Sequence, residues 1–528
     1  MKSYIDHITS TSRSISKDIN IKSQMKIDSR PVFRSSAIFP VFLNKQINVR
    51  LLFLGYWIIK KNIDIVSSVL TIRDKKGKPL FRRSMEIFEV KSYEIDLKKL
   101  LKKIINHKNF VGSAEIEFFS NTNLTFPYPA VTINFFSNSS STFVHTTSRI
   151  YNDYDDKINN NKINVKESGF DLFLKNSSLP IISFVNGPNF INKKLLKFEF
   201  IDQNGHKISY CHSLKNLDPY KPIFLNLLFN SKIKNFLKSD STLVKISHSF
   251  TDFYPRFLVL NINKKKDMTS LTHSYYDTSN LKDKYNFWKN PNKKIYSDAV
   301  LSVPLFKNYI TELVIYPIMS LENSINLDLE IYNKKELIKK VKNFFVINKK
   351  IKKRVSFIVN NLINVPNKND NFVAKISFNS SNVIPSRIKF GMNVKTNKNN
   401  IFPTNICFNA RVANIYNDSK PSSFKWAPII NHKNSFFNIS NISFRKKIKR
   451  DANLIIKFWR EIDNKFIQKK IKINENSFYN FSLCENNKIQ NFLKNKPGWV
   501  TIQSDNSNLD AWYFEDMSKG TIGGDHFF

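Results

Sequence analysis

Three histidines occupy similar places along the chain, and aspartates lie close to two of them. Histidine and aspartate are residue types that are common in reactive sites. His145, His273 and His526 follow three short apolar segments at distances of 31, 29 and 26 residues. Asp277 follows the second histidine closely, and Asp525 directly precedes the third. A histidine with an orienting carboxylate can act as a general base, and the same side chains bind metal ions. A third interpretation is that polar strand ends were copied together with a duplicated core and catalyse nothing.

The spacing of these histidines argues against a metal motif. No two of them show the close separation of a pattern such as H-E-x-x-H. The sequence also lacks the phosphate-binding loops G-x-x-x-x-G-K-[ST] and G-x-G-x-x-G and the nucleophile motif G-x-S-x-G. We therefore expect no metal ion, no cofactor and no nucleotide-dependent chemistry.

Two further groups of side chains could bind a ligand. His206 and His212 are predicted to lie on one face of a strand, where they could bind jointly or simply face solvent. Tyr254 and Arg256 precede a strand bounded by proline, and an arginine beside an aromatic ring can hold a carboxylate or a sugar. An ion pair within one domain is the alternative for this arginine.

Tryptophans are the usual sugar-stacking residues of β-sandwich modules. Among the six in this chain, Trp288, Trp426 and Trp512 are predicted to be the more exposed ones. The remaining three, Trp57, Trp459 and Trp499, lie in apolar or strand-like surroundings and are predicted to be core residues. The alternative for the first three is packing against a neighbouring domain.

The elements that must position these residues recur along the chain. A strand-like triplet recurs at intervals of 130, 130 and 126 residues, as Ala114-Glu115-Ile116, Val244-Lys245-Ile246, Ala374-Lys375-Ile376 and Val500-Thr501-Ile502. The stretch "IKNFL" at 233–237 and the similar "IQNFL" at 489–493 precede two of these triplets and are predicted to form one helical turn. We interpret the pattern as one unit that has been duplicated.

Each triplet is preceded by a predicted hairpin. Asp74 with Gly77 and Asp202 with Gly205 have hairpin chemistry, because aspartate caps a turn and glycine adopts positive φ. The third copy lacks the glycine, so its turn must be built differently. About seven short alternating strands per copy predict an all-β chain of four tandem antiparallel β-sandwiches, with immunoglobulin-like or jelly-roll-like connections.

The chain length of 528 residues supports several domains rather than one core. The predicted organisation is a loosely ordered segment 1–30, followed by β-sandwich repeats over 31–151, 165–277, 295–416 and 424–528.

The chain is strongly basic, with 83 Lys and Arg against 42 Asp and Glu and a formal net charge of +41. Such a charge points to an acidic polymer, a nucleic acid or an acidic membrane as partner. The excess is mostly lysine, accompanied by many Asn, Ile and Phe residues, whose codons are rich in A and T. Its basic runs are short and dispersed, which favours solvated surfaces over one polyanion site.

Three cysteines without C-x-x-C spacing indicate neither a disulfide framework nor a thiolate zinc site. The N-terminal residues lack the apolar core of a secretory signal, and the longest apolar run, at 51–59, is too short to span a bilayer. We expect a cytoplasmic protein without a membrane span, and leave export without a signal open.

The sequence favours a non-enzymatic binding or assembly protein that recognises a polysaccharide or another acidic polymer. The first alternative is an enzyme acting on a carbohydrate or surface-polymer precursor, with a histidine and aspartate site at a domain interface. The second alternative is non-specific nucleic-acid binding through the basic surface. A protein partner or a homo-oligomer stays open. Phe527 and Phe528 are predicted to complete the last strand or to contact a partner.

Overall fold

A computed structural model shows a chain built almost entirely of antiparallel strands. It describes residues 31–102, 109–145, 148–152, 167–173, 178–237, 241–251, 253–263, 268–276, 287–289, 298–315, 324–348, 351–363, 370–379, 383–385, 389–396, 402–412, 423–430, 434–442, 450–506, 509–517 and 520–528. The predicted N-terminal segment 1–30 therefore lies outside the described residues.

The first sandwich pairs two four-stranded sheets. One sheet has the order β1 (Arg34–Leu43), β6 (Phe110–Phe119), β3 (Val66–Arg73), β4 (Pro79–Ile87). The other has the order β5 (Ser92–Asp96), β2 (Asn48–Leu54), β7 (Val131–Phe136), β8 (Ser141–Val144). Two short helices, α2 (Tyr56–Lys61) and α3 (Leu97–Lys102), connect strands of this sandwich.

The second sandwich pairs a five-stranded with a four-stranded sheet. The larger has the order β13 (Lys207–Leu217), β12 (Ile191–Ile201), β15 (Ser241–His248), β10 (Glu167–Phe173), β19 (Tyr275–Tyr276). The smaller has the order β14 (Pro222–Asn226), β11 (Leu179–Val185), β17 (Leu258–Asn263), β18 (Met268–His273). The helices are η1 (Leu227–Phe229) and α5 (Ser231–Phe236).

The third sandwich has the same two sheet sizes. The larger sheet has the order β24 (Leu337–Ile347), β23 (Ile325–Tyr332), β26 (Phe372–Asn379), β21 (Asp298–Leu305), β30 (Arg411–Val412). The smaller has the order β25 (Val355–Ile358), β22 (Tyr309–Ile315), β28 (Lys389–Thr396), β29 (Thr404–Asn409). A single 3-10 turn, η2 (Val359–Leu362), follows β25.

The fourth sandwich again pairs two four-stranded sheets. One has the order β31 (Ser423–Ile429), β36 (Gly498–Ser504), β33 (Ala452–Trp459), β34 (Phe466–Ile473). The other has the order β35 (Ser477–Ser482), β32 (Ser435–Asn441), β37 (Leu509–Asp516), β38 (Ile522–His526). The helices are η4 (Leu483–Glu485) and α7 (Asn487–Leu493).

Two small ribbons lie outside these sheets. One pairs β9 (Arg149–Ile150) with β16 (Phe253–Tyr254), and the other pairs β20 (Phe287–Lys289) with β27 (Val383–Pro385). The first ribbon joins a segment that follows the first sandwich to a strand of the second.

The repeated triplets fall on the equivalent strand of every sandwich. Ala114, Val244, Ala374 and Val500 lie in β6, β15, β26 and β36, and all four are fully buried. In each sandwich this strand lies between the first and the third strand of the repeat, as when Ala114 pairs with Phe39 and with Ile72. The prediction of an all-β chain of tandem β-sandwiches is confirmed, and the shared strand order is what a duplicated unit would give.

The predicted turns and helical turns are confirmed in detail. Gly77 and Gly205 have φ of +87° and +90°, and the carboxylates of Asp74 and Asp202 cap their turns. The third hairpin uses Asn333 instead, whose side chain accepts backbone N–H bonds from the turn, with a register shift beside it. Helices α5 and α7 contain the two stretches expected to form a helical turn.

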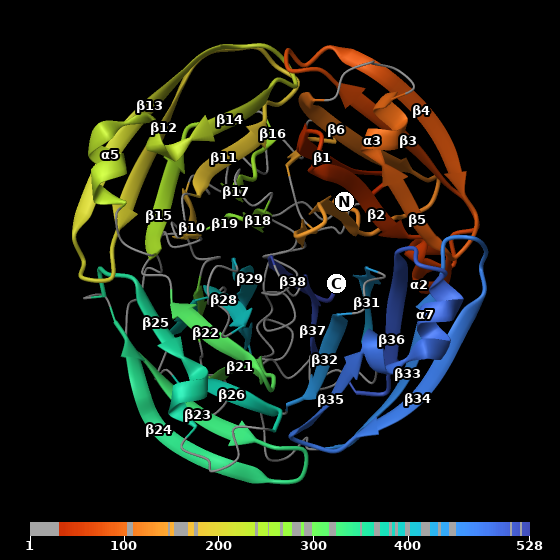
Figure 1. The fold of residues 1–528 in the computed structure, drawn as a ribbon, viewed down its shortest axis with the longest axis vertical. Coiled ribbons are helices and arrows are strands. Elements are labelled where there is room, and N and C mark those ends of the chain that lie inside the picture. The colour runs from red at the N-terminus through yellow and green to blue at the C-terminus, as the bar shows by residue number, and fades with distance from the viewer. Residues whose placement is uncertain are drawn as a thin grey trace.

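The four sandwiches form a closed ring (Figure 1). Four edge strands, β4, β13, β24 and β34, lie on its perimeter, and we call them the rim strands. In the other sheet of each sandwich, the edge strands β8, β18, β29 and β38 meet near the centre, and we call them the axial strands. Each axial strand contacts the next one around the ring, from β8 through β18 and β29 to β38 and back to β8.

Each of these hairpins contacts the next sandwich around the ring at an equivalent place. This place is the start of an edge strand, or the residues just before that strand. The turn at Gly77 meets the backbone of Pro219 ahead of β14, and Arg354 ahead of β25 donates its N–H to Asp202. Ser477 at the start of β35 donates to Lys334 O in the third turn. The fourth turn completes the circle, because Ser92 at the start of β5 donates to Arg460 O. Head-to-tail contacts of this kind close a ring when their rotation permits.

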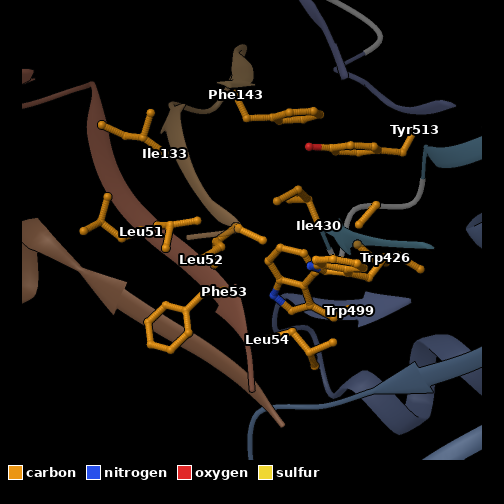
Figure 2. Packing of buried hydrophobic residues seen from close by; sticks show 14 of the residues in the cluster. Leu51, Leu52, Phe53, Leu54, Ile133, Phe143, Trp426, Ile430, Trp499 and Tyr513 are labelled. Atoms are coloured by element: carbon orange, nitrogen blue, oxygen red, sulfur yellow. The ribbon is translucent and has the colours of Figure 1, made fainter. Parts of the chain in front are cut away.

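An apolar cluster joins the last sandwich to the first (Figure 2). Trp426 stacks on Tyr56 with ring centroids 4.7 Å apart, and Phe143 stacks on Tyr513 at 4.9 Å. Such buried aromatic pairs contribute both apolar area and favourable ring geometry. The ring is therefore closed by a continuous core as well as by backbone contacts.

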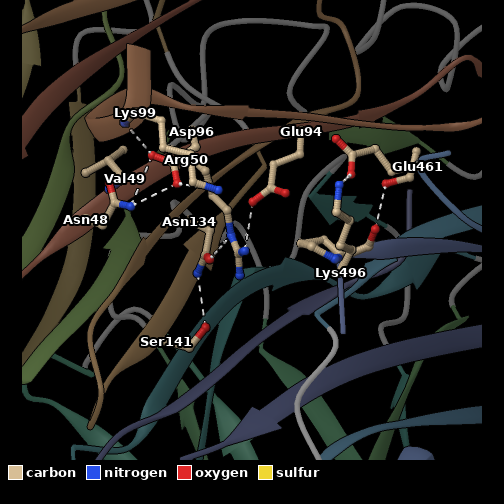
Figure 3. A network of polar contacts seen from close by, with 12 residues as sticks. Asn48, Val49, Arg50, Glu94, Asp96, Lys99, Asn134, Ser141, Glu461 and Lys496 are labelled. Atoms are coloured by element: carbon tan, nitrogen blue, oxygen red, sulfur yellow. Dashed lines mark hydrogen bonds and ion pairs between the residues drawn. The ribbon is translucent and has the colours of Figure 1, made fainter. Parts of the chain in front are cut away.

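A polar network lies beside this core in the first sandwich (Figure 3). Buried Arg50 binds Glu94 and the side-chain oxygen of Asn134, each at 2.9 Å. Asn134 in turn donates to Ser141 of the axial strand β8, and Ser141 donates to Glu515 of the fourth sandwich. The network thus connects the interior of the first sandwich to the axis and to the last sandwich.

No helix among the described residues has both the length and the apolar character needed to cross a membrane. The chain ends inside the fourth sandwich, where Phe527 is buried between Phe437 and Tyr513 and Phe528 stacks on Trp426.

Candidate functional site

The axial strands are joined to one another through side-chain hydroxyl groups. As sheet edges, they have backbone groups that no further strand pairs. Instead, the hydroxyl group of a threonine in or next to one axial strand forms a hydrogen bond with the backbone of the next axial strand. The pairs are Thr142 with Leu271, Thr272 with Asn405, Thr404 with Gly524 and Thr521 with Ser141. Every junction around the axis therefore has at least one such bond.

A glycine allows the closest of these approaches. A Cβ atom on Gly523 of β38 would lie 2.5 Å from the carbonyl oxygen of Ser141 in β8. No side chain fits at that distance, so the "GG" preceding Asp525 lets the last axial strand touch the first. The sequence motif "GGDHFF" thereby places Asp525 and His526 against the first sandwich.

The three predicted histidines converge at one end of the axial strands. His145 directly follows β8, His273 ends β18 and His526 ends β38. The ring of His145 lies 5.6 Å from that of His273 and 4.5 Å from that of His526, measured between centroids. Nδ1 of His145 and Oδ2 of Asp525 are 2.5 Å apart. We call these four residues the axial cluster.

Backbone carbonyl groups orient two of the imidazoles. Nδ1 of His273 donates to the carbonyl oxygen of Ser274 at 2.8 Å, and Nδ1 of His526 donates to that of Phe527 at 2.9 Å. Each ring therefore carries its proton on Nδ1 and has a lone pair on Nε2. Nε2 of His273 is buried and has no hydrogen-bond partner within the described part of the chain, and Nε2 of His526 lies 4.0 Å from Asp525 Oδ1.

The electrostatics of the cluster favour an ionised carboxylate beside two neutral imidazoles, those of His273 and His526. Burial would raise the pKa of Asp525, but the interactions with His145, followed by those with His526 and His273, outweigh this and lower the pKa to about 2. Burial, Arg256 and His145 lower the pKa of His273 well below its usual value. Burial and His145 also lower the pKa of His526. At neutral pH Asp525 is therefore ionised, and His273 and His526 are neutral.

This arrangement has the parts of two kinds of chemistry. A carboxylate bonded to Nδ1 of a histidine fixes its orientation and leaves the other nitrogen to accept a proton. Imidazole nitrogens and a carboxylate oxygen within a few ångströms of one another also form metal sites. The side chains are largely buried, with exposed fractions of 11% for His145, 4% for Asp525 and 33% for His526.

The remaining predicted partner of the histidines and one tryptophan cannot be placed fully. Asp277 lies outside the described residues. The backbone of Trp288 lies in β20 opposite Ile384 of β27, and its side chain lies outside the described part of the structure.

Two tryptophans that were candidates for exposure are buried, in agreement with the packing interpretation. Trp426 and Trp512 are each only 4% exposed. Trp426 packs between Tyr56 of the first sandwich and Phe528, and Trp512 packs against Phe408 of the third. Both indoles fill contacts between sandwiches, which a sequence cannot distinguish from open surface. Their faces do not form a sugar-stacking surface. Trp57, Trp459 and Trp499 are buried as predicted.

Tyr254 and Arg256 lie at the junction of the first and second sandwiches. Tyr254 is buried, and its ring faces the guanidinium of Arg149 at 4.0 Å. The backbone of Arg256 exchanges hydrogen bonds with the hydroxyl of Ser148. The arginine that meets this aromatic ring is therefore Arg149, a fully buried residue that the sequence patterns did not single out.

His206 and His212 face different partners. His206 lies in the turn before β13, exposed, with Nδ1 2.9 Å from Asp202 Oδ2. His212 lies in β13, half-buried, with its ring 5.4 Å from that of Phe229. His206 therefore completes a hairpin turn, and His212 packs at the edge of the core of the second sandwich.

Sequence reasoning also missed a buried ion pair between sandwiches. Arg354 of the third sandwich bonds Asp171 of the second, where both side chains are almost fully buried. In β10 Phe170 and Leu172 lie on one face and Asp171 on the other, which is the ordinary alternation of a strand with one face in the core, so the sequence carries no signal that Asp171 is buried.

Fold and site together define an all-β protein of four sandwiches around an axial histidine and carboxylate cluster. No family model matches the chain, and no curated protein matches it. Among solved structures, a calcium-binding mutant of Bacteroides uniformis beta-glucuronidase 2 is similar over 51% of this chain and 29% of that chain, with 10% identity and a TM-score of 0.12. Less than a third of that chain's length is thus covered, and so low a TM-score establishes no shared function.

Proposed function

We propose that this protein is a non-enzymatic binding protein that holds an acidic polymer along the rim strands of its ring. The observation that carries the proposal is the distribution of charge over these four edges. Ten lysines and arginines lie on them, two each in β4 and β13 and three each in β24 and β34, against one acidic residue, Glu86.

The geometry of the rim suits an extended ligand. Each rim strand is the outer edge of its sheet, and together they follow the perimeter of the ring (Figure 1). Arg83, Lys215, Lys342 and Lys470 are exposed, one on each rim strand. Spaced cations along a path attract a polyanion by summed long-range electrostatics, without a pocket. Edge lysines also oppose pairing with foreign strands, so the same residues keep the ring from aggregating.

A charge-matched pair of variants tests the location of binding. The rim variant combines Arg83→Gln, Lys215→Gln, Lys342→Gln and Lys470→Gln. The control combines Lys102→Gln, Lys232→Gln, Lys234→Gln and Lys488→Gln, which are exposed residues on the short helices α3, α5 and α7. Both variants lose the same charge, so non-specific attraction falls equally in both.

Binding of fluorescently labelled heparin, a sulfated polysaccharide, is measured by anisotropy at several salt concentrations. We expect the rim variant to lose at least about tenfold in affinity and to show a shallower salt dependence than the control. Equal losses in both variants would refute a rim site. Tighter binding of duplex DNA than of heparin, again lost only in the rim variant, would replace the polysaccharide by a nucleic acid as ligand.

A second candidate function is an enzyme that acts on a carbohydrate or surface-polymer precursor. One observation favours it, the hydrogen bond between His145 Nδ1 and Asp525 Oδ2, which is the orienting contact of a histidine general base. Release of reducing sugar from a panel of polysaccharides tests this candidate. If the protein is such an enzyme, the native chain releases reducing sugar and the Asp525→Asn variant does not. A native chain that releases no reducing sugar would count against this function.

A further inference from the structure

We propose that His145, Asp525 and His526 form a binding site for a divalent transition metal that fastens the last sandwich of the ring to the first. This inference does not depend on the ligand of the rim strands. Such an ion would join side chains of the first and the last sandwich through one shared ligand.

The donor atoms lie near the spacing that a shared ion requires. Each of the three residues offers one ligand atom, and these atoms lie within 4.8 Å of one another. Two donors bound to one zinc at about 2.1 Å each can be at most about 4.2 Å apart, and Nε2 of His526 lies 4.0 Å from Asp525 Oδ1. In the tetrahedral geometry that zinc prefers, two such donors are about 3.4 Å apart, so side-chain shifts of about 1 Å bring the three donors onto one ion.

The second observation is the orientation of the imidazoles. His526 donates from Nδ1 to the carbonyl oxygen of Phe527, which is the usual outer contact of a metal-binding histidine. His273 has the same contact with Ser274, and its buried Nε2 has no hydrogen-bond partner among the residues that the structure describes. Leaving a buried polar atom unpaired costs stability, so its presence here points to a ligand that the fold is built to receive.

The donor set selects the class of metal. Two imidazole nitrogens and one carboxylate oxygen suit zinc, nickel or cobalt, whereas magnesium and calcium prefer all-oxygen sites. Asp525 supplies one negative charge, and an ion that binds both His145 and Asp525 displaces the proton that these two now share. His526 is one third exposed and provides the route by which an ion enters.

Zinc binding to the full chain tests the proposal after treatment with a chelator. Competition with a chromophoric chelator gives affinity and stoichiometry, and Co²⁺ replacing zinc gives a visible absorption spectrum that reports nitrogen and oxygen ligands. We expect one tightly bound zinc per chain and a higher thermal midpoint when it is bound. His526→Gln should weaken zinc binding at least about 100-fold, because one of three ligands is lost.

The chain contains a matched control in His206, which pairs with Asp202 through the same two atom types but on the exposed surface. His206→Gln should leave affinity, stoichiometry and the Co²⁺ spectrum unchanged. Asp525→Asn keeps the size of the carboxylate and should weaken binding as His526→Gln does, which guards against a folding defect in one variant. Native chain that binds no zinc, or zinc binding that survives both axial variants, would overturn the proposal.

Discussion

The guanidinium of Arg354 in the third sandwich forms a two-pronged ion pair with Asp171 in the second. Nε lies 2.8 Å from Oδ1 and Nη2 lies 2.9 Å from Oδ2, and the side chains are 4% and 0% exposed. Glu312 and Ser356 each accept one further hydrogen bond from the guanidinium. Because the pair bridges two sandwiches, it ties the stability of one to the position of the other.

Replacing Asp171 by alanine should cost about 3–5 kcal/mol, because it leaves Arg354 buried without its main counterion. The neighbouring Lys352 is exposed, and Lys352→Ala serves as the control with an expected change below about 0.5 kcal/mol. Urea unfolding followed by tryptophan fluorescence measures both. Similar midpoints for the two variants would show that the ion pair contributes little.

Two hairpin glycines separate backbone strain from close approach. Gly77 and Gly205 both have positive φ, yet a Cβ on Gly77 would lie 2.2 Å from Pro219 O, whereas the nearest atom to one on Gly205 is 3.5 Å away. Gly205→Ala should therefore cost only about 1 kcal/mol from strain. Gly77→Ala should cost at least about 2 kcal/mol, since it also separates the first two sandwiches. Equal shifts in thermal midpoint would contradict this contact.

The acid sensitivity of the third sandwich should depend on Glu330. Burial would raise the pKa of this carboxyl, but bonds from Lys340, Tyr332 and Lys375 outweigh it and lower the pKa to about 2. A folded pKa below the unfolded value means stability that is complete above pH 4.5 and is lost as the pH falls towards 2. After allowance for solvent screening, the loss is roughly 1–2 kcal/mol.

The Glu330→Gln variant cannot make these charge contacts. Its deficit in unfolding free energy relative to the native chain should be constant near pH 7 and shrink between pH 4.5 and 2. Guanidinium unfolding at a series of pH values gives this difference directly. A deficit that does not change with pH would rule out an ionised Glu330 as the source.

Local patterns in the sequence were enough to predict the fold within each sandwich. The alternation around Val244 and the turn chemistry of Asp202 and Gly205 depend on neighbours in the chain, and both were found as expected. The ring could not be predicted in the same way, because contacts such as Arg354 with Asp171 join segments 183 residues apart. Nothing in either segment alone specifies the other.

The candidate site was predictable in its residue types and not in its geometry. The similar spacing of His145, His273 and His526 marked equivalent strand ends, but only the closure of the ring brings those ends together. The burial of Trp426 has the same origin, since the side chain that covers it, Tyr56, belongs to a different sandwich.

The contact between His145 and Asp525 is the most direct test of the closed ring, because these residues belong to the first and the last sandwich. A double-mutant cycle with His145→Ala, Asp525→Ala and the double variant, measured by urea unfolding with chelator present, gives their coupling free energy. The closed ring predicts a coupling of about 1–3 kcal/mol. Free energies that add to within about 0.3 kcal/mol would show that the two side chains do not meet and would contradict the ring.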